Sequence, residues 1–177
     1  DCTSRTHERS TLNAVTSRPF QRCALTAMKS FLALLVALTS LIAFAADGPY
    51  DEAADAKAQV GTALAAAKAQ NKNAMIVFGA NWCGDCKMLD GEFKKPALAA
   101  LLDKHYVVVK VDVGRFNKNL DVVKPYGEVI KKGIPSIVIA TPANELVYAT
   151  NGGELADARK MGEAGVAAFF QNLAVRK

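Results

Sequence analysis

The sequence predicts an α/β domain with a mixed central sheet that is flanked by helices on both faces. Two continuous apolar runs, residues 74–80 and 106–114, are typical of strands buried on both faces. Helical segments separate these two strands, so we expect the strands to lie parallel. Two further apolar segments within residues 134–153 surround a turn at Pro142 to Asn144, which predicts an antiparallel pair.

The first helix is expected from Tyr50 onward, within residues 51–73. This segment is rich in alanine, and its apolar residues recur at helical spacing. Asp51 and Glu52 at its start suit the helix dipole. The residues expected on its buried face are Ala56, Val60, Leu64 and Ala67.

Glycine and proline are expected to interrupt the later helices. Residues 86–106 are helical in pattern, with a kink or break marked by Gly91 and Pro96. A helix follows within residues 119–133 and is broken at Pro125. The chain closes with a helix over residues 154–177. The residues expected to be buried by that helix are Leu155, Met161, Val166, Phe169, Phe170 and Leu173.

The first 45 residues differ in composition from the rest of the chain. Residues 28–45 have a positive start and then an uncharged run, and they end in a small-x-small pattern. This predicts a signal peptide that begins at Met28 and is cleaved after Ala45, and hence a periplasmic or secreted protein. An uncleaved membrane anchor is the alternative, although the run is short for a membrane span.

Residues 1–27 are polar and basic and show no helical or strand periodicity. We expect them to be an upstream segment outside the mature protein, with an organellar transit segment as the alternative. The remaining residues, 46–177, have the size of one domain. They hold seventeen Lys and Arg against fifteen Asp and Glu, without a basic stripe, so nucleic-acid binding is not expected.

Two of the four cysteines, Cys83 and Cys86, follow the predicted signal peptide. A zinc site needs four ligands, and residues 46–177 offer no other cysteine and one histidine. A purely structural disulfide across so short a loop would constrain little of the unfolded chain. A redox-active pair is therefore favoured over both alternatives.

The position of Cys83, between a buried strand and a helix, supports this interpretation. Unpaired N–H groups at a helix N-terminus stabilise a thiolate, so Cys83 is expected to be an exposed attacking thiol. Cys86 lies three residues on, where a sheltered thiol can resolve a mixed disulfide formed on Cys83.

The sequence WCGDC after a buried strand, together with GIPS at residues 133–136, resembles the thioredoxin superfamily. The resemblance covers about residues 50–175 and implies a thioredoxin-like fold. It further implies that Pro135 follows a cis peptide bond facing a redox disulfide between Cys83 and Cys86. Substrate would bind at Trp82, Ile134 and Pro135, with the Ile134 backbone pairing with an extended segment.

Two departures from thioredoxin itself stand out. Val77 occupies the position of the buried aspartate that assists proton transfer there, so the partner of Lys110 is not evident. The stretch after Cys86 is similar to the C-terminal domain of the bacterial disulfide-interchange membrane reductase, which has an acid one helical turn later. Asp90 is thus a candidate proton handler for Cys86. The alternative is a solvated aspartate on the helix surface.

Asp85 bears on the direction of electron flow. A carboxylate between the cysteines disfavours the Cys83 thiolate, whereas Lys87 acts oppositely. A less stable thiolate makes the disulfide less oxidising, so we expect a potential at or below about −200 mV.

The sequence therefore predicts an exported thiol–disulfide oxidoreductase that reduces protein disulfides through WCGDC. We expect a monomer without bound cofactor or metal, which receives electrons from a membrane thiol reductase. The alternatives are a disulfide oxidase or isomerase, and a non-enzymatic thioredoxin-like chaperone or metallochaperone that binds a soft ion such as Cu(I).

Overall fold

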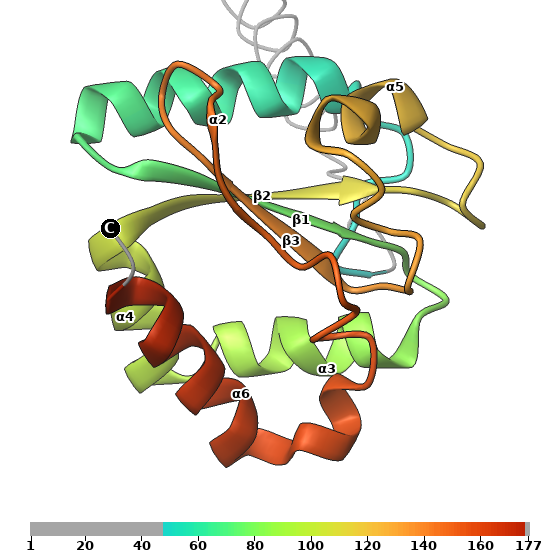
Figure 1. The fold of residues 1–177 in the computed structure, drawn as a ribbon, viewed down its shortest axis with the longest axis vertical. Helices are drawn as coiled ribbons and strands as arrows, with labels where there is room; N and C mark the ends of the chain where they lie inside the picture. The colour runs from blue at the N-terminus through green and yellow to red at the C-terminus, as the bar shows by residue number, and fades with distance from the viewer. Residues whose placement is uncertain (1–47, 176–177) are drawn as a thin grey trace, which may run out of the picture. The chain divides into compact units, whose positions relative to one another are not determined.

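The structure, a computed structural model, describes residues 48–175 and contains one mixed sheet in the strand order β2-β1-β3-β4. β1 pairs in parallel with β2 and antiparallel with β3, and β3 and β4 form an antiparallel pair (Figure 1). The mixed sheet is confirmed, as are the parallel early strands and the final antiparallel pair. The strands are β1 (Asn73–Gly79), β2 (Tyr106–Asp112), β3 (Ser136–Ala140) and β4 (Leu146–Ala149).

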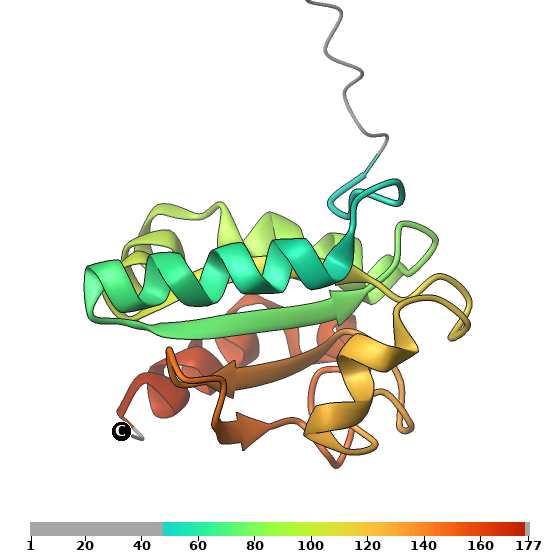
Figure 2. The ribbon, with the colours of Figure 1, turned by 90° about the horizontal axis from the view of Figure 1, so that it is seen from above.

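Helices cover both faces of the sheet. α2 (Ala56–Gln70) and α5 (Leu120–Val123) lie on one face, while α3 (Gly84–Phe93), α4 (Pro96–His105) and α6 (Ala158–Val175) lie on the other (Figure 1). Figure 2 shows α2 running alongside β1.

Side chains of β1 enter both layers of the core alternately. Ile76 and Phe78 pack in the layer that includes α2, and Met75 and Val77 pack in the layer that includes α3, α4 and α6. Successive side chains of a strand point to opposite faces, so a strand covered on both faces needs an unbroken apolar run. The helix-on-both-faces architecture is therefore confirmed.

α2 begins later than the sequence analysis expected. The helix starts at Ala56 because the Asp55 side chain caps it, accepting hydrogen bonds from the N–H groups of Lys57 and Ala58. The segment around Tyr50 is instead held to the loop after β1. There Tyr50 N–H donates to Asn81 Oδ1 at 3.0 Å, and Asn81 Nδ2 donates to the Tyr50 carbonyl at 2.8 Å.

Proline divides the remaining helices largely as expected. The break between α3 and α4 falls at Pro96, which occupies the first turn of α4, whereas Gly91 lies inside α3. Pro125 lies in a 3₁₀ turn, η2 (Lys124–Tyr126), directly after α5. Ile134 and Pro135 are joined by a cis peptide bond.

α6 is kinked at Gly162, where φ is 66°. Of the apolar residues expected to be buried by the closing segment, Leu155, Val166, Phe170 and Leu173 are buried, while Met161 and Phe169 are only half-buried. Leu155 precedes the helix. The kink changes the direction of the helix. Glycine adopts this positive φ without strain, whereas a residue with a side chain would be strained there.

None of the helices within residues 48–175 is long and apolar enough to cross a membrane. The predicted signal peptide and the segment ahead of it lie outside the described residues. The described residues belong to one compact unit, in which the sheet is covered on both faces.

Candidate active site

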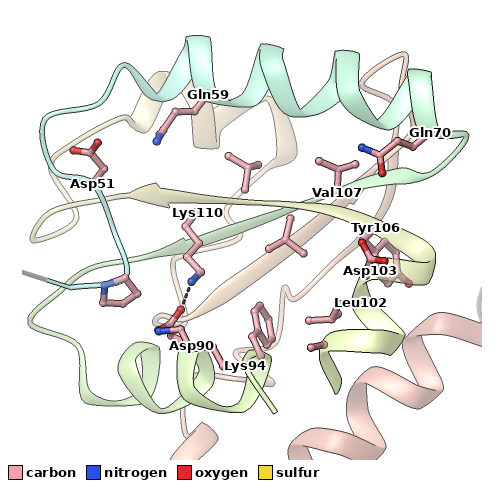
Figure 3. Close-up of a pocket in the computed structure, with 15 residues that line it drawn as sticks. Asp51, Gln59, Gln70, Asp90, Lys94, Leu102, Asp103, Tyr106, Val107 and Lys110 are labelled. Atoms are coloured by element: carbon pink, nitrogen blue, oxygen red, sulfur yellow. Dashed lines mark hydrogen bonds and ion pairs between the residues drawn. The ribbon is translucent and has the colours of Figure 1, made fainter. Parts of the chain in front are cut away.

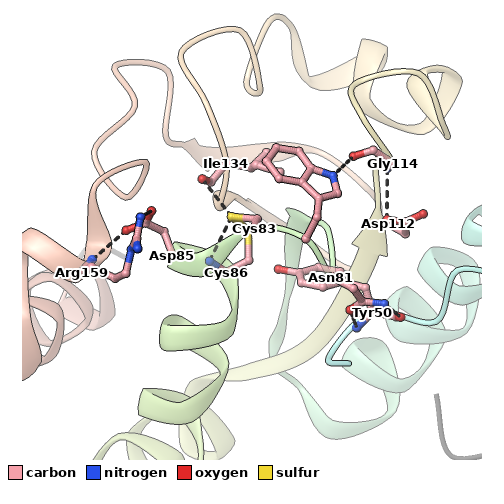
Figure 4. The surroundings of a disulfide bond; sticks show 10 residues. Tyr50, Asn81, Cys83, Asp85, Cys86, Asp112, Gly114, Ile134 and Arg159 are labelled. Carbon is pink, nitrogen blue, oxygen red and sulfur yellow. Dashed lines mark hydrogen bonds and ion pairs between the residues drawn. A yellow bond between two sulfur atoms is a disulfide. The ribbon is translucent and has the colours of Figure 1, made fainter. Parts of the chain in front are cut away.

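The two cysteines lie where β1 leads into α3, at the carboxyl end of the strand. Cys83 is the N-cap residue of α3, and its sulfur accepts a hydrogen bond from the Cys86 N–H at 3.1 Å. The two residues form a disulfide with their Cα atoms 5.2 Å apart (Figure 4). The N–H groups of the first turn of α3 therefore point at the sulfur of Cys83, where a thiolate would form on reduction.

Both cysteines are buried in this oxidised form. Cys83 is 5 % exposed and Cys86 is 1 % exposed. The expectation of an exposed Cys83 is therefore wrong for the disulfide state, although Cys83 remains the more accessible of the two. The cause is close packing from the opposite loop, because the Ile134 carbonyl oxygen lies 3.5 Å from the sulfur of Cys83.

The loop that covers Cys83 ends in the cis peptide bond before Pro135. Ser136, the first residue of β3, directly follows Pro135. Its hydroxyl forms hydrogen bonds of 2.7 Å with the Val129 carbonyl and with the Thr150 hydroxyl. The cis bond and its position against Cys83 agree with what the resemblance implies. The Ile134 backbone is thereby held at the edge of the disulfide.

Trp82 forms an exposed aromatic surface beside Cys83. Its side chain is 49 % exposed, yet its indole N–H donates to the Gly114 carbonyl at 2.8 Å, which fixes the ring. The exposed ring of Phe116 packs edge-on against it with centroids 6.1 Å apart, and the Arg115 guanidinium lies 5.5 Å from the Trp82 ring centroid. Trp82 is predictable from its place beside Cys83, whereas Phe116 and Arg115 are not, because they follow β2 in a loop without a recognisable motif.

Asp85 is paired rather than solvated. Its carboxylate accepts hydrogen bonds from the Arg159 backbone N–H at 2.9 Å and from the Arg159 guanidinium at 3.1 Å (Figure 4). Burial alone would raise the pKa of the Asp85 carboxyl, but the hydrogen bonds and charge of Arg159 outweigh it and lower that pKa. Asp85 is therefore ionised, and the guanidinium offsets part of the negative charge that it places beside Cys83.

Asp90 is buried and bound to two lysines. It forms an ion pair with Lys110 of β2 and another with Lys94 at 2.7 Å (Figure 3). Burial would raise the pKa of Asp90, but the hydrogen bonds from Lys110 and Lys94 lower it below its usual value. The alternative of a solvated surface aspartate is therefore wrong. The pairing also explains Lys110, whose partner the sequence did not reveal.

Asp90 and Lys110 stand in a groove of about 680 Å³ along the open edge of β2. Its apolar lining includes Val107 to Val109, Phe93 and Leu102, and neither cysteine lines it (Figure 3). The dithiol itself therefore lies outside this groove. Within residues 48–175, no three His, Cys, Asp or Glu side chains are grouped closely enough to hold a metal ion.

Comparison with known proteins assigns the chain to a family. A sequence model described as thioredoxin-like matches residues 55–142. A crystal structure described as a disulphide isomerase from Xylella fastidiosa Temecula1 has 47 % sequence identity and a TM-score of 0.70, over 73 % of this chain and 98 % of that one. The chain belongs to the thioredoxin-like family. Curated proteins give no match to it.

Two further solved structures resemble this thioredoxin-like chain more distantly. The C-terminal domain of Neisseria meningitidis DsbD in its reduced form has 19 % identity and a TM-score of 0.48, over 67 % of this chain and 96 % of that one. A thioredoxin from Thermus thermophilus has 22 % identity and a TM-score of 0.40, over 61 % and 87 % of the two chains.

The thioredoxin-like fold and the CxxC pair together are those of a thiol–disulfide oxidoreductase. Within that fold this chain has its own charge arrangement. Val77 of β1 pairs in register with Lys110, and the carboxylate that meets Lys110 comes from Asp90 on α3 instead of from the strand. Val77 is buried among apolar side chains, so the strand itself supplies no charged partner for Lys110.

Proposed function

We propose that this thioredoxin-like chain is an exported enzyme that reduces protein disulfides through Cys83 and Cys86. The observation that carries the proposal is the placement of Cys83 at the N-cap of α3, with Cys86 bonded to it and the Ile134 carbonyl against its sulfur. A structural disulfide has no need of a helix N-terminus or of an adjoining backbone edge, whereas a nucleophilic thiolate uses both.

The reaction runs in two exchange steps. The Cys83 thiolate attacks one sulfur of the substrate disulfide, a new S–S bond forms, and the other substrate sulfur leaves as a thiolate. Cys86, having lost its proton, then attacks the Cys83 sulfur and expels the second substrate sulfur. The substrate disulfide gains two electrons, and the protein is left with the Cys83–Cys86 disulfide.

The docking face in this proposal consists of Trp82, Ile134 and Pro135. Trp82 presents a fixed and half-exposed ring, which suits contact with a polypeptide, since an immobilised aromatic side chain loses little entropy on binding. An extended substrate segment would pair with the Ile134 backbone and bring its disulfide to Cys83. Asp90 is the proposed proton handler for Cys86, from its position one helical turn later.

Export and the electron donor are part of the same proposal. The positive start at Met28, the uncharged run and the cleavage pattern before Ala46 support a signal peptide and a periplasmic or secreted location. An exported dithiol needs a source of electrons, for which we propose a membrane thiol reductase. In this proposal the protein is a monomer and contributes to redox homeostasis outside the cytoplasm. N-terminal analysis of the exported protein should give Ala46 as the first residue.

Disulfide isomerisation is a second candidate function, because the Xylella fastidiosa protein, which is 47 % identical, is described as a disulphide isomerase. The two activities differ in the state of the dithiol after turnover. A reductase ends each cycle oxidised and needs an electron donor, whereas an isomerase returns to the reduced form after rearranging its substrate.

One experiment tests the proposed activity. Residues 46–177 are reduced, freed of reductant and mixed with a protein that contains accessible disulfides. We expect one substrate disulfide to be reduced for each protein oxidised, no reaction with Cys83→Ser, and an accumulating mixed disulfide with Cys86→Ala. If Cys83→Ser reduces the substrate as fast as the wild type does, the proposal is wrong.

A further inference from the structure

A buried tyrosine lies against the resolving cysteine. Tyr50 is 1 % exposed and precedes α2, and it is held at the site by the paired hydrogen bonds of its backbone with Asn81. Figure 4 shows its ring directed toward Cys86. No motif in the sequence singles out this residue, because its position depends on a contact between segments 31 residues apart.

Gly79 shows how closely the tyrosine approaches the sulfur. A Cβ atom placed on Gly79 would overlap the Tyr50 hydroxyl and would lie 3.0 Å from the sulfur of Cys86. The hydroxyl and the sulfur therefore border the same small space at the end of β1. A glycine at this position keeps that space open, so the two groups face each other without an intervening side chain.

The Tyr50 hydroxyl makes no hydrogen bond to any residue within the part of the chain that the structure describes. Burial and the negative charges of Asp90 and Asp112 raise the pKa of Tyr50 well above its ordinary value. Tyr50 therefore keeps its proton at neutral pH and is available as a hydrogen-bond donor.

Opening the disulfide supplies an acceptor at this place. On the basis of the proposed function, we propose that the Tyr50 hydroxyl donates a hydrogen bond to the Cys86 thiolate, and so favours the attack of Cys86 on the mixed disulfide. A hydrogen bond to the charged form of a group stabilises that form. The proposal thus adds Tyr50 to the residues that touch the reacting sulfurs.

The step balances without any further reactant. Cys86 loses its proton to solvent by way of Asp90, the proposed proton handler, and Tyr50 keeps its own proton throughout. The Cys86 sulfur uses an electron pair to bond to the Cys83 sulfur, the bond from Cys83 to the substrate sulfur breaks, and that sulfur leaves with the bonding pair.

Two charged side chains near this space act on the Tyr50 hydroxyl as well. Asp90 faces it from α3 and Asp112 from the end of β2, and each carries a lysine partner: Lys110 for Asp90 and Lys118 for Asp112, the latter at 3.3 Å. Neither ion pair includes the Tyr50 hydroxyl. Tyr50→Phe therefore isolates the contribution of the hydroxyl.

The test uses a nitroaryl disulfide reagent whose two aryl thiolates absorb visible light once released. One equivalent is mixed rapidly with reduced residues 46–177. The first release reports the attack of Cys83, and the second release reports the resolution by Cys86. A hydrogen bond to a charged acceptor commonly changes an acid dissociation constant about ten- to hundredfold. The greater nucleophilicity of a more basic thiolate offsets part of this, so Tyr50→Phe should slow the second release about three- to tenfold at neutral pH.

The first release should be unchanged in Tyr50→Phe, and the pH midpoint of the second release should rise. Tyr106→Phe is the matched control, because Tyr106 is also buried but its hydroxyl lies 3.4 Å from the Leu173 carbonyl, at the opposite end of β2. This control should leave both releases unchanged. Thermal unfolding of each variant verifies the fold. If Tyr50→Phe does not fold, the two releases are measured instead in Asn81→Ala, which removes the hydrogen bonds that hold the Tyr50 segment.

The outcomes separate this proposal from the proposed function. A second release in Tyr50→Phe that matches the wild type in rate and pH midpoint overturns the role of Tyr50 while leaving dithiol chemistry intact. An equal slowing in Tyr106→Phe overturns it too, since the effect would then not be specific to the site. A wild type that releases only one aryl thiolate contradicts the proposed function itself.

Discussion

The ion pairs of Asp90 permit a prediction about stability with a defined pH dependence. The perturbation is Asp90→Asn, which keeps the shape of the side chain and removes its charge. In the folded protein the Asp90 side chain is 10 % exposed and that of Lys110 is 25 % exposed, so this pair lies between the buried and the solvent-exposed extremes. The second partner, Lys94, is 75 % exposed and adds little.

The magnitude follows from those exposures. Breaking a buried pair costs about 3–5 kcal/mol, while exposed pairs contribute about 0–1 kcal/mol. Discounting for the partial exposure of Lys110, we expect Asp90→Asn to lower the free energy of unfolding by about 1–3 kcal/mol at pH 7. The pKa of Asp90 is lowered in the folded state. Its contribution is therefore present above the unfolded pKa of about 3.9 and disappears as the pH falls through the folded value.

Urea denaturation of residues 46–177, followed by circular dichroism at several pH values, measures this difference. Asp103→Asn is the matched control, because the Asp103 side chain is 88 % exposed and its ion pair with Lys72 spans 3.5 Å. The control should not change the stability measurably. If Asp90→Asn is as stable as the wild type at pH 7, or if its deficit persists unchanged below about pH 3, the ion pairs of Asp90 do not stabilise the fold in this way.

Two other residues give predictions that separate electrostatic from docking roles. Arg159→Gln should leave the charge of Asp85 uncompensated beside Cys83, so alkylation of Cys83 in a Cys86→Ala background should slow. The change should be less than about tenfold, because solvent screens an exposed charge. Asp85→Asn should speed the alkylation instead, and equal effects of the two variants would contradict this electrostatic role. Trp82→Ala should slow the reduction of a protein disulfide about fivefold or more, because it removes an aromatic anchor. The reaction with a small disulfide reagent should be unchanged. An equal loss on both substrates would exclude a docking role.

Much of this fold was predictable because single-sequence signals coincide with its main elements. The apolar runs of β1 and β2 are continuous because both faces of the sheet are covered. Pro96 and Pro125 fall at helix boundaries, since a proline in a helix interior removes a hydrogen bond and clashes with the preceding turn. The placement of Cys83 at a helix N-terminus followed from the strand before it and the helical spacing after it.

The rest depended on contacts that sequence spacing does not encode. Arg159 meets Asp85 across 74 residues, and Lys110 meets Asp90 across 20. The accessibility of Cys83 was mispredicted because the loop that covers it comes from Ile134, 51 residues later. The start of α2 was misplaced because the acidic Asp51 and Glu52 suggested a first turn, whereas Asp55 provides the cap.

The equilibrium reduction potential of the Cys83–Cys86 pair distinguishes a reductase from an oxidising protein. Residues 46–177 would be equilibrated in thiol–disulfide buffers of known potential, with Cys86→Ala as the control that cannot form the disulfide. We predict a potential at or below about −200 mV, as for a protein that donates electrons. A potential near about −120 mV would contradict this prediction and would identify an oxidising protein instead.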